Sequence, residues 1–277
     1  MSLSGWARGV RRHWIGFAGG IILGVFLLAG ILASVIAPQD PNKIDLTADL
    51  LGPGPRHFLG TDQLGRDVFS RLLYGARSTL GLAIPITLAV TAIGIVVGLV
   101  AGYFGGWIDM IISALLNALF ALPGLVLTLA VLALLGPGRL SLLVALIAAG
   151  WASFARIVRG PVLVIRESGY VESARAIGAT DRRILIRHVL PNVLGPILVL
   201  ATLDFGTVLL SIASLSFLGL GERPPAAEWG TMLNDGRPYF RSHPLLMVLP
   251  GLCIFLLVLG VNLLGDTLRD VVDPRHR

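Results

Sequence analysis

Residues 169–191 read GYVESARAIGATDRRILIRHVLP, and this polar stretch decides how the chain is interpreted, because long apolar runs flank it on both sides. Ser168 and Thr180 are residue types that cap helices. Gly178 permits a turn with positive φ, and Pro191 lacks the N–H that a helix needs, so we expect it to end a helix. The stretch therefore predicts two short helices joined by a tight turn, which we call the projection (residues 169–191). One face of its first helix is apolar and carries Tyr170, Val171, Ala174 and Ile177.

The composition is that of an integral membrane protein. Of the 277 residues, 55% are hydrophobic and 14% are charged, and the mean hydropathy is +0.83, which leaves too little polar surface to cover a soluble globule. The net charge of +6 does not indicate nucleic-acid binding, because the basic residues are almost all Arg and cluster at the edges of apolar segments. We expect membrane lipid around this chain and no nucleic acid.

Six apolar segments are long enough to span a bilayer, which takes about 20 residues. They cover residues 14–37, 79–104, 108–135, 140–158, 193–218 and 245–265. Arg residues gather before the first segment, around the projection and after the last segment, and the positive-inside rule makes these regions cytoplasmic. We therefore predict that both termini are cytoplasmic. Residues 1–78 would form a helix and an extracytoplasmic segment, and residues 79–277 a five-helix core.

Prolines and glycines within these segments predict how the helices bend and pack. Pro85 and Pro123 should kink the second and third spans. Gly94, Gly98 and Gly102 repeat every fourth residue, a spacing that lets two helices approach closely in lipid. We expect this repeat to pack inside the molecule rather than form a dimer seam.

The chain lacks the residues of an ATPase or a metalloenzyme. Lys43 is the only lysine and stands outside any Gly-rich loop, which excludes a Walker-type phosphate site, so ATP-driven work must come from a partner. Cys253 is the only cysteine, and the histidines are scattered without ligand spacing. We predict no catalytic residue, no metal site and no cofactor in this chain.

The spacing within the projection resembles the EAA motif of binding-protein-dependent ABC importer permeases. The matching region comprises Glu172, Ser173, Ala174, Gly178, Leu190 and Pro191. Two positions depart from the pattern, because Ser173 stands where the family usually has Ala and His188 where it usually has Ile. The resemblance implies that the loop over residues 159–192 holds the coupling helix that docks on a separate ATPase subunit. The alternative is an ordinary charged cytoplasmic loop.

Further stretches resemble the second permease subunit of the dipeptide, oligopeptide and nickel importers. They are GTDQLGRDVFSRLLYGARSTL at 60–80, LSFLGLG at 215–221 followed by EWG at 228–230 and NDGR at 234–237, and NLLGD at 262–266. Within the first stretch we expect residues 68–77 to form an amphipathic helix on the outer membrane interface, with Arg71 and Arg77 on its polar side.

The resemblance implies an all-α permease with six transmembrane helices in a bacterial inner membrane, working by alternating access. It also implies the partners: a homologous second permease subunit, two ATPase subunits that hold ATP and Mg²⁺, and an extracytoplasmic substrate-binding protein. The implied cargo is a dipeptide, an oligopeptide, or free or chelated nickel, with residues 200–204 and 227–230 most similar to the nickel-type branch. A stand-alone secondary transporter or channel, and a membrane scaffold or sensor, are the alternatives.

One carboxylate, Asp204, falls near the middle of the fifth apolar segment. A charge at that depth costs about 2.5 to 3.5 kcal/mol, so the side chain should face the bundle interior or a water-filled pathway. Two roles are open: contact with substrate, or a hydrogen-bonded acid that braces neighbouring helices. Asp204 is our candidate residue for the substrate pathway.

Overall fold

The computed structural model describes residues 3–272, and the side chains of residues 14–270. Over that range the chain forms helices and turns, with no strand beyond an isolated bridge between Thr61 and Asp67, which confirms the all-α fold class. The longer helices are α1 (Leu3–Ile31), α3 (Val68–Phe104), α4 (Gly106–Phe120), α5 (Gly124–Leu135), α6 (Arg139–Arg166), α9 (Leu190–Phe217) and α11 (Leu245–Val272). The shorter elements are α2 (Ala33–Ile36), α7 (Gly169–Ala176), α8 (Asp181–Ile184), α10 (Trp229–Gly236), two 3₁₀ turns (Leu46–Ala48 and Arg237–Tyr239) and a π-helical turn (Leu185–Val189).

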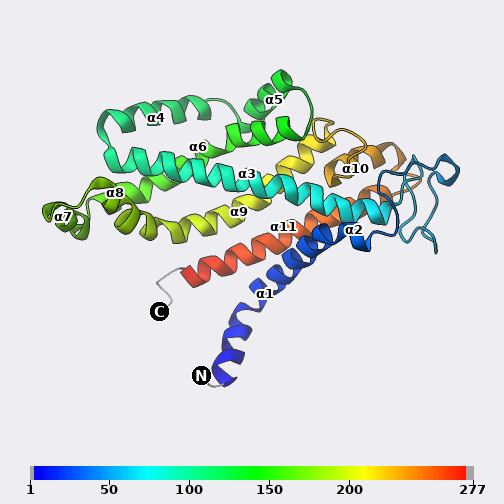
Figure 1. Cartoon of the computed structure of the whole chain (residues 1–277), viewed down its shortest axis with the longest axis horizontal. Coiled ribbons are helices and arrows are strands. Elements are labelled where there is room, and N and C mark those ends of the chain that lie inside the picture. The colour runs from blue at the N-terminus through cyan, green and yellow to red at the C-terminus, as the bar shows by residue number, and fades with distance from the viewer. Residues whose placement is uncertain (1–2, 273–277) are drawn as a thin grey trace.

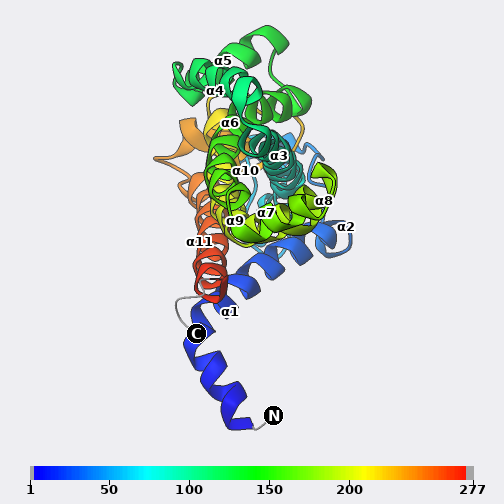
Figure 2. The same cartoon turned by 90° about the vertical axis from the view of Figure 1, so that its left-hand side faces the viewer.

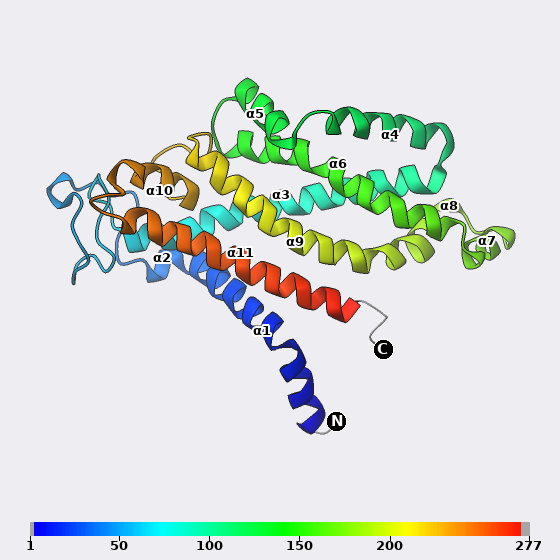
Figure 3. The same cartoon turned by 180° about the vertical axis from the view of Figure 1, so that it is seen from behind.

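The centre of the molecule is an elongated bundle in which α3 packs against both α6 and α9 (Figures 1 and 3). Close packing between α3 and α6 depends on glycine. A Cβ added to Gly98 would lie 2.7 Å from the Val158 Cβ, and one added to Gly102 would lie 2.8 Å from the Val162 Cβ. Both distances are too short for real atoms, so the glycine repeat packs inside the molecule, as predicted.

Within residues 3–272, five helices are each long and apolar enough to cross a membrane, and a sixth span is reached if α4 and α5 count as one. This pair corresponds to the third expected span, which is broken rather than kinked: the two helices meet at 85°. Pro123 stands immediately before α5, where the missing N–H of a proline costs least, and so separates the two helices. Pro85 lies inside α3, which continues through it as one helix.

Residues 68–77 do not form a separate interfacial helix, and that expectation was wrong. They are the first turns of α3, which runs on past the expected domain boundary after residue 78. The Asp67 carboxylate caps the start of α3 by accepting the Ser70 N–H at 2.8 Å. Arg71, expected on a polar outer face, is only 1% exposed, because its charge is neutralised inside the protein.

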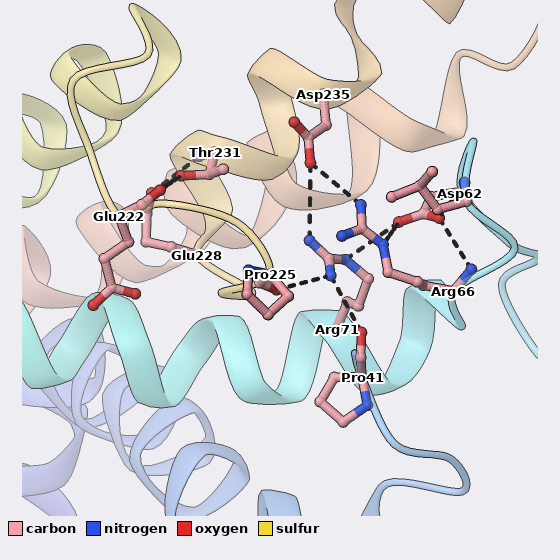
Figure 4. A network of polar contacts seen from close by, with 10 residues as sticks. Pro41, Asp62, Arg66, Arg71, Glu222, Pro225, Glu228, Thr231 and Asp235 are labelled. Atoms are coloured by element: carbon pink, nitrogen blue, oxygen red, sulfur yellow. Dashed lines mark hydrogen bonds and ion pairs between the residues drawn. The ribbon is translucent and has the colours of Figure 1, made fainter. Parts of the chain in front are cut away.

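A buried ionic cluster ties the start of α3 to α10. Its members are Asp62, Arg66, Arg71 and Asp235 (Figure 4). Asp62 accepts from the Arg66 Nε at 2.7 Å and lies 3.4 Å from the Arg71 Nε. Asp235 on α10 lies 3.4 Å from the Arg66 Nη2. Arg71 also donates to the Pro41 carbonyl at 3.2 Å, so the cluster joins three distant parts of the chain.

Two glutamates complete this end of the bundle. Glu228 is fully buried and caps α10, accepting from the N–H groups of Gly230 at 2.9 Å and Thr231 at 3.0 Å. Burial raises the pKa of Glu228, although these N–H donors act against the rise. Glu222 accepts from the Arg139 Nη1 at 2.7 Å and so joins the loop before α10 to the start of α6. We call this region the α10 end.

Candidate functional site

The projection lies at the opposite end of the bundle from α10 (Figures 1 and 3). Seen from that end, α7 and α8 lie in front of α3 and α9 (Figure 2). The turn between α7 and α8 passes through Gly178 with φ +82°, which confirms the predicted left-handed glycine. The two short helices and the turn between them have the predicted order. We call this region the projection end.

The predicted caps have the right positions but not the predicted bonds. Ser168 and Thr180 are the N-cap residues of α7 and α8, yet neither side chain accepts a hydrogen bond from the helix that it precedes. The Ser168 hydroxyl instead donates to the Ile165 carbonyl at 2.6 Å and so satisfies the last turn of α6. Ser168 therefore supports the junction between α6 and α7.

Pro191 does not end a helix, contrary to the prediction. It lies in the first turn of α9, and residues 181–217 form one helical segment. The π-helical turn at Leu185–Val189 explains how, because the Leu190 N–H donates to the Leu185 carbonyl five residues earlier. The helix thus changes its hydrogen-bond register immediately before Pro191, the residue that has no N–H to donate.

The apolar face of α7 is divided between the bundle and solvent. Val171 is fully buried and Ala174 is 6% exposed, so both pack against the core. Ile177 is 86% exposed and Tyr170 is 47% exposed, although all four were expected on one face. A surface groove runs beside them between α7 and the π-helical turn, and its lining includes His188 and Arg183. The projection thus presents apolar side chains to the outside.

Apart from Ala174, which packs against the core, the residues of the EAA-like pattern fall into two groups. Glu172, Ser173 and Gly178 are exposed around the turn. Leu190 and Pro191 lie at the start of α9 and fix the base of the projection. Ser173, the departure from Ala, donates its hydroxyl to the Gly169 carbonyl at 2.7 Å, so it is satisfied within α7.

The projection is attached to α3 by a contact that sequence analysis missed. The Tyr103 hydroxyl donates to the Asp181 carboxylate at 2.6 Å, and the Arg175 guanidinium lies 5.2 Å from the centre of the Tyr103 ring. Next to it, Arg166 of α6 donates to the Gly102 carbonyl at 3.2 Å. A lone acid within an Arg-rich stretch and a tyrosine at the end of an apolar span were the available signals.

Asp204 lies in α9 and is partly exposed. No hydrogen bond or ion pair to its carboxylate is found among the side chains of residues 14–270. Thr207, Ser211 and Ser214 follow at helical spacing on the same side of α9, and each is at least partly exposed. The carboxylate thus begins a polar stripe on an otherwise apolar helix.

A second polar seam joins α4 to α6. Asp109 accepts two bonds from Arg159, at 2.5 Å and 2.7 Å, in the paired geometry that arginine and carboxylate favour. Arg156 donates to the Asn117 side chain at 2.9 Å, and its guanidinium lies 3.8 Å from the centre of the Phe120 ring. The seam adds polar contacts to a small apolar cluster, in which Leu116 of α4 packs with Ala152 and Ala155 of α6.

These features, a helical membrane bundle with a polar projection and no catalytic constellation among the described residues, define a membrane transport permease. The chain belongs to the family described as binding-protein-dependent transport system inner membrane component, which matches residues 94–277. Residues 6–53 match the N-terminal transmembrane domain of oligopeptide transport permease C. The chain is therefore a permease subunit of an ABC importer of the dipeptide, oligopeptide and nickel type.

The similar proteins support this assignment over nearly the whole chain. The glutathione transport system permease protein GsiD of Escherichia coli O6:K15:H31 is 44% identical over 271 residues, covering 98% of this chain and 89% of that protein. GsiD of Shigella boydii serotype 4 gives the same values. The MetNI methionine ABC transporter, in an inward-facing conformation, shares the fold, with a TM-score of 0.59 and 23% identity over 73% of this chain and 96% of that one.

Proposed function

We propose that this chain is the second-type permease subunit of an importer that carries short peptides of the glutathione type into the bacterial cytoplasm. The substrate class rests on the names of relatives that are 44% identical over 98% of the chain. This supports the peptide branch over the nickel branch that the short motifs favoured. A small peptide carries carboxylates and an amine, so it needs a pathway with polar and charged side chains.

The observation that carries the proposal is the apolar surface of the projection. Ile177 is 86% exposed at a place where charged residues gather, so lipid does not cover it. Apolar side chains ringed by polar ones mark surfaces for protein partners. We propose that an ATPase subunit covers this surface and that Glu172, Ser173, Ala174, Gly178, Leu190 and Pro191 form its coupling site. The loop over residues 159–192 would then be the coupling loop.

The complete importer would contain this chain, a homologous second permease, two ATPase subunits and an extracytoplasmic binding protein. ATP and Mg²⁺ would bind only to the ATPase subunits. The start of α1 and the end of α11 point toward the projection end (Figure 1). In the proposed topology that end, with both termini, is cytoplasmic, and the α10 end faces the binding protein.

We propose that Asp204 lines the substrate pathway. The support is its partial exposure and its place at the start of a stripe of hydroxyl side chains on α9. In lipid such a stripe would leave a carboxylate without water, whereas a hydrated pathway between two permease subunits satisfies it. The charge would face the amine of a peptide.

The test of function is uptake by the complete importer in proteoliposomes. We expect ATP-dependent uptake of glutathione or a dipeptide, and its loss when Glu172 and Gly178 are changed together to Ala. Uptake of nickel alone would refute the peptide assignment. Uptake by this chain without ATPase subunits would favour a stand-alone transporter, and normal peptide uptake after deletion of the gene would favour a scaffold or sensor.

The pathway role has its own test. Asp204→Asn should lower the uptake rate or raise the half-saturating peptide concentration, while ATPase subunits still co-purify. Asp266→Asn is the matched control, because Asp266 is an exposed aspartate near the end of α11. Unchanged uptake by Asp204→Asn would leave only the bracing role.

A further inference from the structure

Beyond the apolar packing of Val171 and Ala174 against the core, the projection has three connections to the rest of the molecule. It continues from α6 at one side and into α9 at the other, so both connections run along the chain. The third connection is not covalent and reaches α3. Among the described residues, the hydrogen bond from Tyr103 to Asp181 is the one that joins residues 169–191 to α3.

The bond has the properties of a strong, directed contact. The 2.6 Å distance between hydroxyl and carboxylate oxygens is typical of a hydrogen bond to a charged acceptor. Tyr103 is only 4% exposed, so its ring is fixed by packing and its hydroxyl has one direction to point. Arg175 of α7 lies against the same ring at 5.2 Å, so both short helices of the projection meet at this tyrosine.

The position of Tyr103 on α3 connects this contact to the other end of the bundle. It stands one residue before the end of α3, whose 37 residues run from the α10 end to the projection end (Figure 1). At the other end of the same helix, Arg71 lies in the buried ionic cluster with Asp235 of α10. A single helix is thus bonded by polar contacts to both ends of the bundle.

We propose that Tyr103 is a positioning residue that transmits movement of the projection to α3. The inference rests on the proposed function, because the movement would come from the ATPase subunits. When the projection shifts, α6 and α9 follow through the chain, and α3 follows because Tyr103 holds Asp181. Without that bond α3 is moved only through its packing against α6 and α9. Communication between the ATPases and the binding protein at the α10 end then weakens.

The stability of the fold should depend little on this bond. Asp181 is exposed, so water can replace the lost donor, and phenylalanine preserves the buried ring of Tyr103. If the bond between Tyr103 and Asp181 had only a structural role, removing it would either have no effect or lower the thermal stability. A transmitting role would show as a loss of communication in an assembled importer.

The experiment uses the complete importer in proteoliposomes, with wild type, Tyr103→Phe, Asp181→Ala and the double variant. The measured quantities are ATPase co-purification, basal ATP hydrolysis, and stimulation of hydrolysis by the substrate-loaded binding protein. We expect the first two to match wild type and the stimulation to fall about tenfold, the scale of one hydrogen bond to a charged group. The double variant should be no worse than either single one, because both remove the same bond.

Tyr239→Phe is the matched control, since it removes a tyrosine hydroxyl at the α10 end for which no hydrogen bond is found among the described residues. Full stimulation in Tyr103→Phe would overturn the inference, as would equal losses of ATPase co-purification and stimulation, which would indicate a docking defect. Failure of the wild-type chain to bind any ATPase would refute the proposed function instead, and it would be evident before any variant was compared.

Discussion

The two ends of the bundle use charge in opposite ways. At the α10 end, Asp62, Arg66 and Arg71 are buried, and together with Asp235 their charges balance. At the projection end, Arg182 and Arg183 are exposed, and Ile177 lies in the open. The charged cluster of the first end is paired within this chain, whereas the exposed charges and apolar side chains of the second have the composition of a surface that a partner covers. This difference supports our proposal that the projection end is a docking surface, whereas the ionic cluster at the α10 end is preformed.

The largest effect should come from breaking the buried cluster. Arg71→Ala leaves Asp62 and Asp235 with one guanidinium fewer in a buried site, and such losses cost about 3 to 5 kcal/mol. We expect a lower unfolding temperature in detergent and less protein in the membrane. Arg241→Ala, at an exposed arginine of the same end, should match wild type. Equal stability of the two variants would contradict a closed α10 end.

A smaller effect is expected at the turn of the projection. Gly178→Ala forces a Cβ into a backbone with φ +82°, which costs about 1 to 2 kcal/mol, although no atom lies within 4 Å of the new methyl group. Gly169→Ala adds the same atom in α7, also with open space around it but with no positive φ. Only the first should weaken ATPase co-purification. Identical results from the two alanines would show that the turn geometry is unimportant.

The α10 end should also show a pH dependence that arises from Glu228. Because burial raises the folded-state pKa of Glu228 above its unfolded value, stability is fully present below the unfolded value and is lost as pH rises through the folded value. The loss is at most about 1.4 kcal/mol per pH unit. Unfolding temperatures between pH 4 and 8 should therefore fall more for wild type than for Glu228→Gln. Parallel curves would refute this account of Glu228.

The smallest effect on stability, with a clear effect on assembly, is expected at Ile177. Ile177→Ser changes a side chain that is 86% exposed, so the unfolding free energy should shift by less than about 0.5 kcal/mol. Co-purification of ATPase subunits should nevertheless decrease. Val171 lies six residues earlier and is fully buried, so Val171→Ser should mainly lower the stability of the fold. A stability loss at Ile177 would mean that the projection packs against this chain.

The sequence predicted the features that depend on local pattern. The apolar runs predicted six spans, five of which are single long helices, and Gly178 predicted the left-handed turn, because both follow from composition and neighbouring residues. The predictions were wrong where distant partners or the hydrogen-bond register of the backbone determine the local structure. Arg71 is buried because α10 supplies Asp235, and α9 continues through Pro191 because a π-helical turn precedes it.

The contact between Tyr103 and Asp181 shows the same limit within the site. The two residues are 78 positions apart, and neither belongs to a pattern that names the other. Their meeting depends on how the end of α3 lies beside the last turns of α6, which helix length alone does not determine. By contrast, the exposed group at Glu172 and Ser173 could be located from spacing, because the turn that presents it is local.

The docking role of the projection end can be tested most directly by chemical protection. The chain would carry Ile177→Cys or, at the other end, Leu46→Cys, each with Cys253 replaced by Ser. Leu46 is 68% exposed and serves as the matched site. Maleimide labelling of the purified permease pair is then compared with and without bound ATPase subunits. We predict that ATPase binding slows labelling at position 177 at least tenfold and leaves labelling at position 46 unchanged. Equal labelling at position 177 in both states would contradict a docking role for the projection.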